Sequence, residues 1–170
     1  MQRLTAVVAV AVCLLLAGCF GSQQPAFPLS SAVPALGAGG RYETFERVDG
    51  KDTPAGQVTV RPRDDGAYDF VNDKGASNPV SFHPIADGLH VAQIKLEGDS
   101  GYGYAMLNVN GDEALIVPAE CDRQDQAKMV ALGVEIRGRF ECRIDKVADP
   151  AAFFSGLVKG DPISKMVKLK

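Results

Sequence analysis

From Arg41 onward the chain repeats one pattern, in which short runs of alternating apolar and polar residues end at a turn-forming pair. Alternation over a few residues is typical of a β-strand with one buried face. A glycine preceded by aspartate or asparagine supplies the positive φ angle that a tight hairpin turn needs. The pairs are Asp49-Gly50, Asp65-Gly66, Asp87-Gly88 and Asn110-Gly111. This pattern restricts the fold to strands that are joined in sequence by hairpins.

The same pattern predicts strands over residues 41–48, 56–62, 67–72, 79–84, 89–97, 102–110 and 113–118. The apolar residues that alternate along them are Val58/Val60, Tyr68/Phe70, Val80/Phe82, Ala92/Ile94/Leu96 and Ala105/Leu107/Val109. Consecutive strands joined by tight turns form an antiparallel meander, and a long meander hides its edges by closing on itself. The predicted fold is therefore mainly β: an antiparallel meander that closes into a small β-barrel or barrel-like sheet. Two short helices are expected in the C-terminal third.

The first of these helices is predicted over residues 124–132, where Asp122 caps its start and Gly133 ends it. The clearest alternation in the chain follows, over residues 134–144, and predicts one continuous strand. Its buried face is expected to carry Val134, Ile136, Gly138, Phe140, Cys142 and Ile144. Its solvated face is expected to carry Glu135, Arg137, Arg139, Glu141 and Arg143.

The second helix is predicted to begin at Pro150 after an Asp149 cap and to end at Gly160. Its apolar stripe consists of Phe153, Phe154, Leu157 and Val158. The tail from Lys165 to Lys170 alternates lysine with apolar residues imperfectly. We expect either an edge strand protected by its lysines or a frayed end.

The start of the chain predicts export. Arg3 supplies a positive charge, an apolar run extends from Leu4 to Ala17 with one interruption at Thr5, and small residues precede Cys19. A membrane-spanning helix needs about 20 apolar residues. Because this run is shorter, a cleaved signal is favoured over a transmembrane helix.

The residues Leu16-Ala17-Gly18-Cys19 resemble the lipobox of bacterial lipoproteins. The resemblance implies that residues 1–18 are a signal peptide and that Cys19 is acylated, with palmitate among its chains, and becomes the new N-terminus. Plain secretion is the alternative. In Gram-negative relatives an aspartate after the cysteine favours retention in the inner membrane, so Phe20 favours the periplasmic face of the outer membrane.

Residues 19–40 are predicted to form a flexible tether. Proline, glycine, serine and glutamine dominate this stretch, charges are absent, and the apolar residues show no period. Such a segment cannot bury enough surface to offset its ordering entropy. The predicted organisation is a signal peptide over 1–18, a tether over 19–40 and a single β-rich domain over 41–170.

The remaining cysteine pair predicts a disulfide. Cys121 and Cys142 form an even pair in a protein that is expected to be exported. The alternative is a metal pair, but the two cysteines are far apart in sequence and the chain has only two histidines, His83 and His90. These flank a turn that contains Asp87, and two histidines with one acid make a poor zinc site. We therefore expect no metal and no cofactor.

The stretch Gly98-Asp99-Ser100-Gly101 resembles the nucleophile motif of trypsin-like serine proteases. Those proteases also need a histidine base and a two-barrel fold larger than this chain. His83 and His90 precede Ser100 too closely to lie on a separate barrel. The expected structure is a hairpin loop, and no catalytic residue is assigned.

A second local resemblance is to the membrane-bound C-type lysozyme inhibitors, which are small periplasmic β-barrel lipoproteins. The residues that carry it are Ser100-Gly101-x-x-Tyr104 and then Gly111-Asp112-Glu113-Ala114. The resemblance implies that Ser100 and Tyr104 contact lysozyme. Asn110 stands where that family has a supporting lysine, and the region from Cys121 onward has no counterpart.

The broader likeness is to small envelope lipoproteins of proteobacteria that combine a meander, two cysteines and a short C-terminal helix. The formal charge of the chain is −3, without a basic stripe, which argues against a nucleic-acid partner. The predicted function is therefore a lipid-anchored envelope lipoprotein with a non-enzymatic binding or structural β-domain. Its partners are expected to be the membrane, through the lipid, and an unknown protein or small hydrophobic ligand; the alternative is the lysozyme inhibitor.

Overall fold

The computed structural model describes residues 20–98, 100–137 and 141–170. The barrel strands are β2 (Gly40–Val48), β3 (Lys51–Pro62), β4 (Tyr68–Asn72), β5 (Ser77–Ala86), β6 (Leu89–Lys95), β7 (Tyr102–Asn110), β8 (Glu113–Val117) and β11 (Ser164–Lys168). The other elements are β1 (Phe20–Ser22), η2 (Leu29–Ser31), η3 (Cys121–Arg123), α2 (Gln126–Ala131), β9 (Glu135–Ile136), β10 (Cys142–Arg143) and α3 (Pro150–Ser155).

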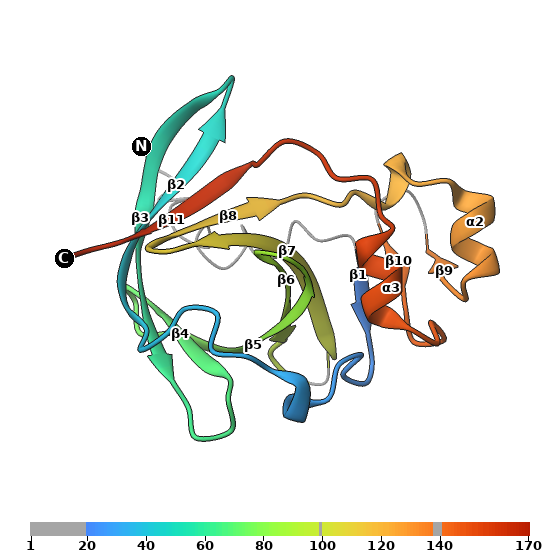
Figure 1. Cartoon of the computed structure of the whole chain (residues 1–170), viewed down its shortest axis with the longest axis horizontal. Coiled ribbons are helices and arrows are strands. Elements are labelled where there is room, and N and C mark those ends of the chain that lie inside the picture. The colour runs from blue at the N-terminus through green and yellow to red at the C-terminus, as the bar shows by residue number, and fades with distance from the viewer. Residues whose placement is uncertain (1–19, 99, 138–140) are drawn as a thin grey trace, which may run out of the picture.

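The eight barrel strands form a closed antiparallel barrel, which confirms the predicted fold class (Figure 1). Strands β2 to β8 pair in sequence order, and β11 closes the ring between β8 and β2. The C-terminal tail was predicted as an edge strand or a frayed end, and this is wrong. Met166 is buried in the barrel, while Lys165 pairs with Asp52 and lies over the ring of Phe45.

The predicted turns join the predicted strands. Asp49 and Gly50 both have positive φ angles, 51° and 74°, as a type I′ hairpin turn requires. The β2–β3 hairpin is longer than expected because β3 begins at Lys51, and a bulge opposite Thr44 keeps the two strands paired. This hairpin projects beyond the barrel (Figure 1).

The inside of the barrel is filled by side chains. Tyr42, Tyr68, Phe70 and Phe82 are each at most 4% exposed and occupy its centre with aliphatic residues around them. The valine, tyrosine, phenylalanine, isoleucine and leucine residues that alternate along the predicted strands belong to this cluster, as expected. The barrel is therefore a packed core.

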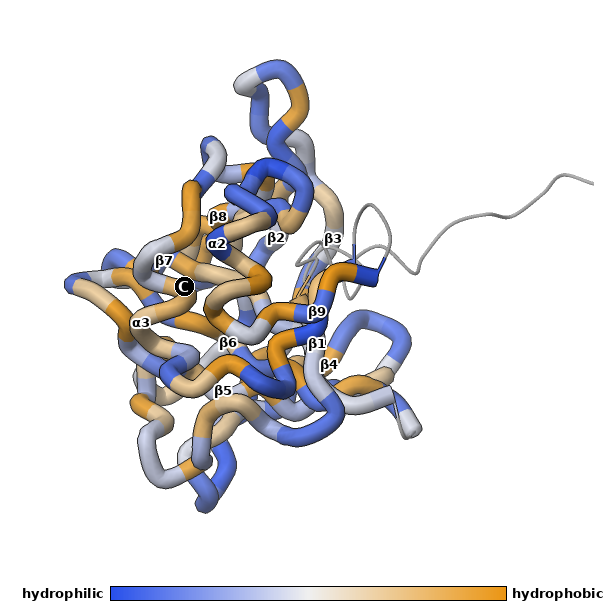
Figure 2. Tube along the Cα trace, turned by 90° about the vertical axis from the view of Figure 1, so that its right-hand side faces the viewer, coloured by the Kyte–Doolittle hydropathy of each residue, from blue (hydrophilic) through white to orange (hydrophobic). Residues whose placement is uncertain are grey.

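A second layer covers one side of the barrel. Between β8 and β11 the chain leaves the ring to form α2, β9, β10 and α3, and α3 packs against β5. Figure 2 looks onto this layer, with α2, α3, β1 and β9 in front of the barrel strands. Its own apolar core is built around Phe20, Phe27, Tyr104, Phe153 and Phe154.

The continuous strand predicted over 134–144 is wrong. Its two ends form the short strands β9 and β10, which pair with each other as a hairpin, while residues 138–140 lie outside the described part of the chain. Cys142 is buried as predicted, but Arg143, assigned to the solvated face, is only 9% exposed. Arg143 is covered because β1 pairs alongside it, with Gly21 opposite.

The two helices are shorter than predicted. Asp125, not Asp122, caps α2 by accepting a hydrogen bond from the backbone N–H of Lys128, because residues 121–123 form the 3-10 turn η3 instead. Asp149 caps α3 as predicted, with Pro150 at its first position. That helix ends at Ser155, before Gly160, because the i→i−4 pattern stops there: the N–H of Leu157 bonds the carbonyl of Phe154, three residues earlier.

Residues 20–39, called here the N-terminal segment, were predicted to lie within a flexible tether, and the structure contradicts this. Phe20, Phe27 and Leu36 are 2%, 6% and 5% exposed. The backbone N–H of Val33 donates to the carbonyl of Phe82, and the Tyr68 hydroxyl donates to the carbonyl of Gly37. Burial of these three apolar side chains stabilises the ordered segment against its loss of conformational entropy. The average composition of the segment did not reveal this contribution.

A disulfide joins Cys121 to Cys142, with Cα atoms 6.1 Å apart. It ties η3 to β10 across the second layer, as the even cysteine pair predicted. Cys142 is also the direct neighbour of Phe20 in the sheet. The disulfide therefore anchors β10, the strand that pairs with β1 at the start of the described chain.

Candidate functional site

A row of buried polar side chains on the outer face of the barrel binds the N-terminal segment. Ser81 and His83 from β5, Gln93 from β6 and Tyr104 from β7 lie side by side because they occupy the strand positions that point away from the barrel interior. The amide of Gln93 bonds both the N–H and the carbonyl of Phe27 at 3.0 Å, as a paired strand would. We call these four side chains the polar row.

The row forms one directed chain of hydrogen bonds. Gln93 Nε2 donates to Ser81 Oγ, and Ser81 Oγ lies 2.9 Å from His83 Nε2. His83 Nδ1 lies 2.9 Å from Ser31 Oγ, whose hydroxyl donates to the carbonyl of Pro28. With the Ser31 hydroxyl assigned as donor to Pro28, the tautomer that fits both contacts has the His83 proton on Nδ1, and Nε2 accepts from Ser81. Every member is then satisfied.

The Ser31–His83 pair has the spacing of a nucleophile and its base, which raises the question of whether His83 activates Ser31. A general base must accept the proton of the serine. In this tautomer His83 donates to Ser31, and burial lowers the pKa of His83 to about 4, which makes it a poor base near neutral pH. The other ring nitrogen of His83, Nε2, contacts the hydroxyl of Ser81, whereas the corresponding nitrogen in a catalytic triad contacts a carboxylate. The geometry holds the N-terminal segment in place and does not activate Ser31.

The structure separates the two histidines that the sequence placed beside one turn. His83 faces the N-terminal segment and stacks on Phe27 at a ring distance of 4.7 Å. His90 lies beside Leu107 and so belongs to the strand positions that face the barrel interior. Within the described residues, no group of three or more histidine, cysteine or acidic side chains is arranged to hold a metal ion.

The two residues predicted to contact a partner lie in different surroundings. Ser100 is exposed in the loop between β6 and β7, whereas Asp99 of the same motif lies outside the described residues. Tyr104 is 1% exposed, and its hydroxyl contacts Ser22 at 2.6 Å and accepts from the N–H of Ala26. Burial raises the pKa of Tyr104. Tyr104 is thus a member of the polar row and is not available at the surface.

Arg143 and Asp145 hold the start of the N-terminal segment from the other side. Arg143 Nε donates to Asp145 Oδ2 at 3.2 Å, and Asp145 Oδ1 accepts from the backbone N–H of Gln23. Burial alone raises the pKa of Asp145, but the bonds from Gln23 and Arg143 outweigh it, so the pKa is lowered. The residue designated for lipidation, Cys19, lies just outside the described residues.

An apolar groove of about 450 Å³ lies between α2 and α3. This volume is within the range of small-molecule sites. Its apolar lining consists of Met129, Ala131, Leu132, Val147, Ala148, Ala152, Phe153 and Leu157. Leu132 at its rim is 45% exposed. We call this the helical groove.

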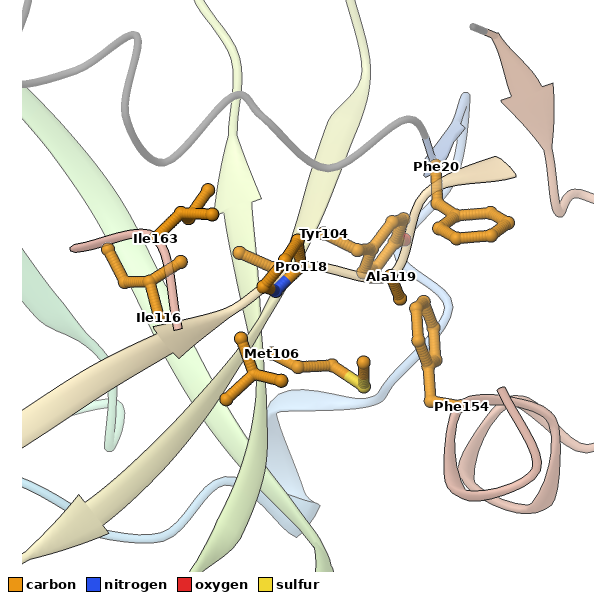
Figure 3. A pocket seen from close by; sticks show the side chains of 10 residues that line it. Phe20, Tyr104, Met106, Ile116, Pro118, Ala119, Phe154 and Ile163 are labelled. Carbon is orange, nitrogen blue, oxygen red and sulfur yellow. The ribbon is translucent and has the colours of Figure 1, made fainter. Parts of the chain in front are cut away.

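Two smaller hollows are less suited to a ligand. The crevice in Figure 3, with Phe20 and Phe154 on one side and Ile116 and Ile163 on the other, has a volume of about 10 Å³, room for one water molecule.

A hollow of about 210 Å³ between the N-terminal segment and the barrel is lined by two cationic side chains, Arg63 and Lys95. Arg63 is already paired with Asp65 and Asp69 at 3.1 Å, and Lys95 lies over the Tyr102 ring. These partners compete with any anion. The helical groove is the largest of these three hollows, and most of its lining is apolar.

Comparisons of the chain with models of protein families, with curated proteins and with solved structures found no match. Among the described residues, none of the helices has the length and apolar character needed to cross a membrane. The function must therefore be argued from the sequence motifs and the geometry of this chain.

Sequence reasoning missed both the polar row and the helical groove. Ser81 and Gln93 sit at outward positions of strands, where polar residues are ordinary. The signal that could have revealed the row was Phe27, a large aromatic residue inside a stretch assigned to solvent. The groove depends on where the fold places α2 and α3 relative to each other, which no local pattern encodes.

Proposed function

We propose that this chain is a lipid-anchored lipoprotein of the bacterial cell envelope whose β-barrel domain is a non-enzymatic binding or structural module. The observation that carries the proposal is the lipobox-like Leu16-Ala17-Gly18-Cys19, followed at Phe20 by a folded domain. Stable anchoring needs more than one acyl chain, and the lipobox resemblance implies two or three. The periplasmic face of the outer membrane is the proposed location.

Two features of the domain support this proposal. The Cys121–Cys142 disulfide suits an oxidising compartment such as the periplasm. The packed barrel interior leaves the outer surface as the place for binding, and the polar row uses its hydrogen-bonding groups to hold the N-terminal segment. A partner, whether a protein or a small hydrophobic ligand, would then bind outside the barrel.

The deciding experiment is intact-mass spectrometry of the protein purified from the membranes of a Gram-negative host that expresses the full chain. The expected mass lacks residues 1–18 and carries acyl chains on Cys19. The C19A variant should keep its leader and gain no lipid. A native protein with Cys19 unmodified, or with the leader attached, would refute the proposal.

A second candidate function is inhibition of C-type lysozyme, favoured by the exposure of Ser100 at the β6–β7 loop. The burial of Tyr104 removes the second predicted contact residue. Purified protein in excess should slow lysis of cell walls by C-type lysozyme if this candidate is right, and the S100A variant should slow it less. Unchanged lysis at excess protein would exclude it.

A further inference from the structure

We propose that the helical groove is an acyl-chain site, occupied by one of the protein's own lipid chains attached at Cys19. This inference rests on the proposed lipidation. It adds a binding site and its ligand class, a saturated or monounsaturated fatty acyl chain. The proposal follows from the lining of the groove, from its closeness to Phe20, which follows Cys19 in the sequence, and from the charges at its rim.

The lining suits an apolar occupant because three of its polar members, Gln124, Asp125 and Asp149, already have hydrogen-bond partners. Gln124 accepts from the N–H of Val158 and donates to the carbonyls of Val158 and Glu120. Asp125 and Asp149 each accept from the first turn of the helix that they cap. A polar ligand would have to compete with these bonds, whereas an acyl chain needs only the apolar wall.

The groove lies one side chain away from the start of the described chain. Phe153 lines the groove, and its ring also packs against the ring of Phe20 at a centroid distance of 5.5 Å. Phe20 is 2% exposed and is fixed in the sheet between β7 and β10. Cys19 is the preceding residue in the sequence, so a lipid on Cys19 would begin one residue before Phe20. A fatty acyl chain is long compared with one phenylalanine ring.

Covalent attachment makes a modest groove sufficient. A ligand tethered this closely has an effective concentration of ~mM or more, so it can fill a site that a free fatty acid would leave empty. A free fatty acid, by contrast, would have to bind the groove through its own affinity and would pay the full entropic cost of association.

The charges at the rim favour this occupant over direct docking to a bilayer. The groove is flanked by Asp125 and Asp149 against one cation, Lys128. Anionic lipid surfaces attract basic segments and repel acidic ones. An acyl chain that is covalently attached at Cys19 needs no electrostatic attraction to reach the groove.

The absence of tryptophan from the chain makes a clean test available. L132W and A152W each place a single fluorophore at the groove, on the α2 side and the α3 side, where both residues are exposed. V158W is the matched nearby control, since Val158 is 63% exposed and follows the groove residue Leu157 without lining the groove. V48W is the distant control on the β2–β3 hairpin.

The full chain is expressed in a host fed either a brominated or an unlabelled fatty acid, and the purified proteins are compared in detergent. Bromine quenches tryptophan at short range. We expect severalfold loss of emission in L132W and A152W and little loss in V158W and V48W. Equal quenching of V158W and the groove variants would mean that the chains reach this region only through the micelle, and the groove assignment would fail.

Mass spectrometry of the same samples separates the two proposals. Brominated chains on Cys19 without quenching at the groove would overturn the acyl-chain site and leave the lipid anchor standing. Protein without any acyl chain on Cys19 would overturn both.

Discussion

The Phe27→Ala substitution tests whether the N-terminal segment is part of the folded domain. The Phe27 ring is 6% exposed, stacks on His83 and lies 6.1 Å from the Phe154 ring. The backbone bonds of residue 27 to Gln93 do not involve the ring and remain in the variant. The substitution therefore removes only packing.

The expected cost is about 3 kcal/mol, the lower end of the range for Phe→Ala in a core, because the ring also borders a surface hollow that solvent can fill. With a urea m-value of about 2 kcal/mol/M for a domain of this size, the midpoint should fall by about 1.5 M. Far-UV circular dichroism follows the transition. The matched control is Leu29→Ala in the same segment, where the side chain is 48% exposed and the cost should stay within about 0.5 kcal/mol.

The two interpretations of the segment predict different outcomes. A flexible tether has no native contacts to lose, so F27A would unfold at the same urea concentration as the native protein. A midpoint difference between F27A and L29A below about 0.3 M would refute the packed segment. A lower m-value in F27A would instead show that the segment unfolds before the barrel does.

Three further predictions test the buried state of His83, the disulfide and the packing of β1 against the β6–β7 loop. Burial lowers the pKa of His83 from 6.5 to about 4, so between these pH values the unfolded state binds more protons than the folded state. The free energy of unfolding should therefore be highest above pH 6.5 and fall by about 3 kcal/mol towards pH 4. Denaturation at several pH values should show this slope in the native protein and a shallower one in H83Q; equal slopes would argue against a neutral, buried His83. The C121A/C142A variant should lose ~3 kcal/mol in urea unfolding, and an unchanged midpoint would mean that the cross-link does not constrain the unfolded chain. Gly98→Ala has open space and should cost about 1 kcal/mol in thermal unfolding, whereas Gly101→Ala places its Cβ 2.1 Å from the Ser22 carbonyl oxygen and should cost at least about 2 kcal/mol more; equal costs would mean that β1 is not seated against this loop.

The barrel could be predicted from sequence because its determinants are local. Val58 and Val60 point inward because strand side chains alternate, and Asp49-Gly50 turns the chain because both residues adopt positive φ. Each hairpin then brings the next strand to the correct partner. Only the total number of strands and the identity of the closing strand required more than local information.

The closing strand β11 could not be identified in this way. Its partners β2 and β8 are far from it in sequence, and its lysines are typical of an edge. Lys165 is tolerated in an interior strand because its side chain points outward to Asp52. The apolar Met166 was the local sign that one face of the tail is buried.

The candidate site was predicted less well than the fold, because it is formed by long-range packing. The polar row joins β5, β6 and β7 to residues that lie about 50 to 80 positions earlier in the chain. Averaging the composition of residues 19–40 hid the contribution of Phe20 and Phe27. A few large apolar residues can order a polar segment when a complementary surface awaits them.

The packing of Phe20 also determines how the domain is oriented under the proposed anchoring. β1 pairs with β7, and in the ring of eight strands β3 lies opposite β7. A long tether would let every side of the barrel approach the membrane, but a lipid attached one residue before Phe20 would keep the β7 side nearest to it. The projecting β2–β3 hairpin, with Val48 58% exposed, then lies on the side of the barrel farthest from the lipid. Under the proposed anchoring, this three-residue strand would therefore determine which side of the barrel lies near the bilayer and which side is presented to the aqueous compartment.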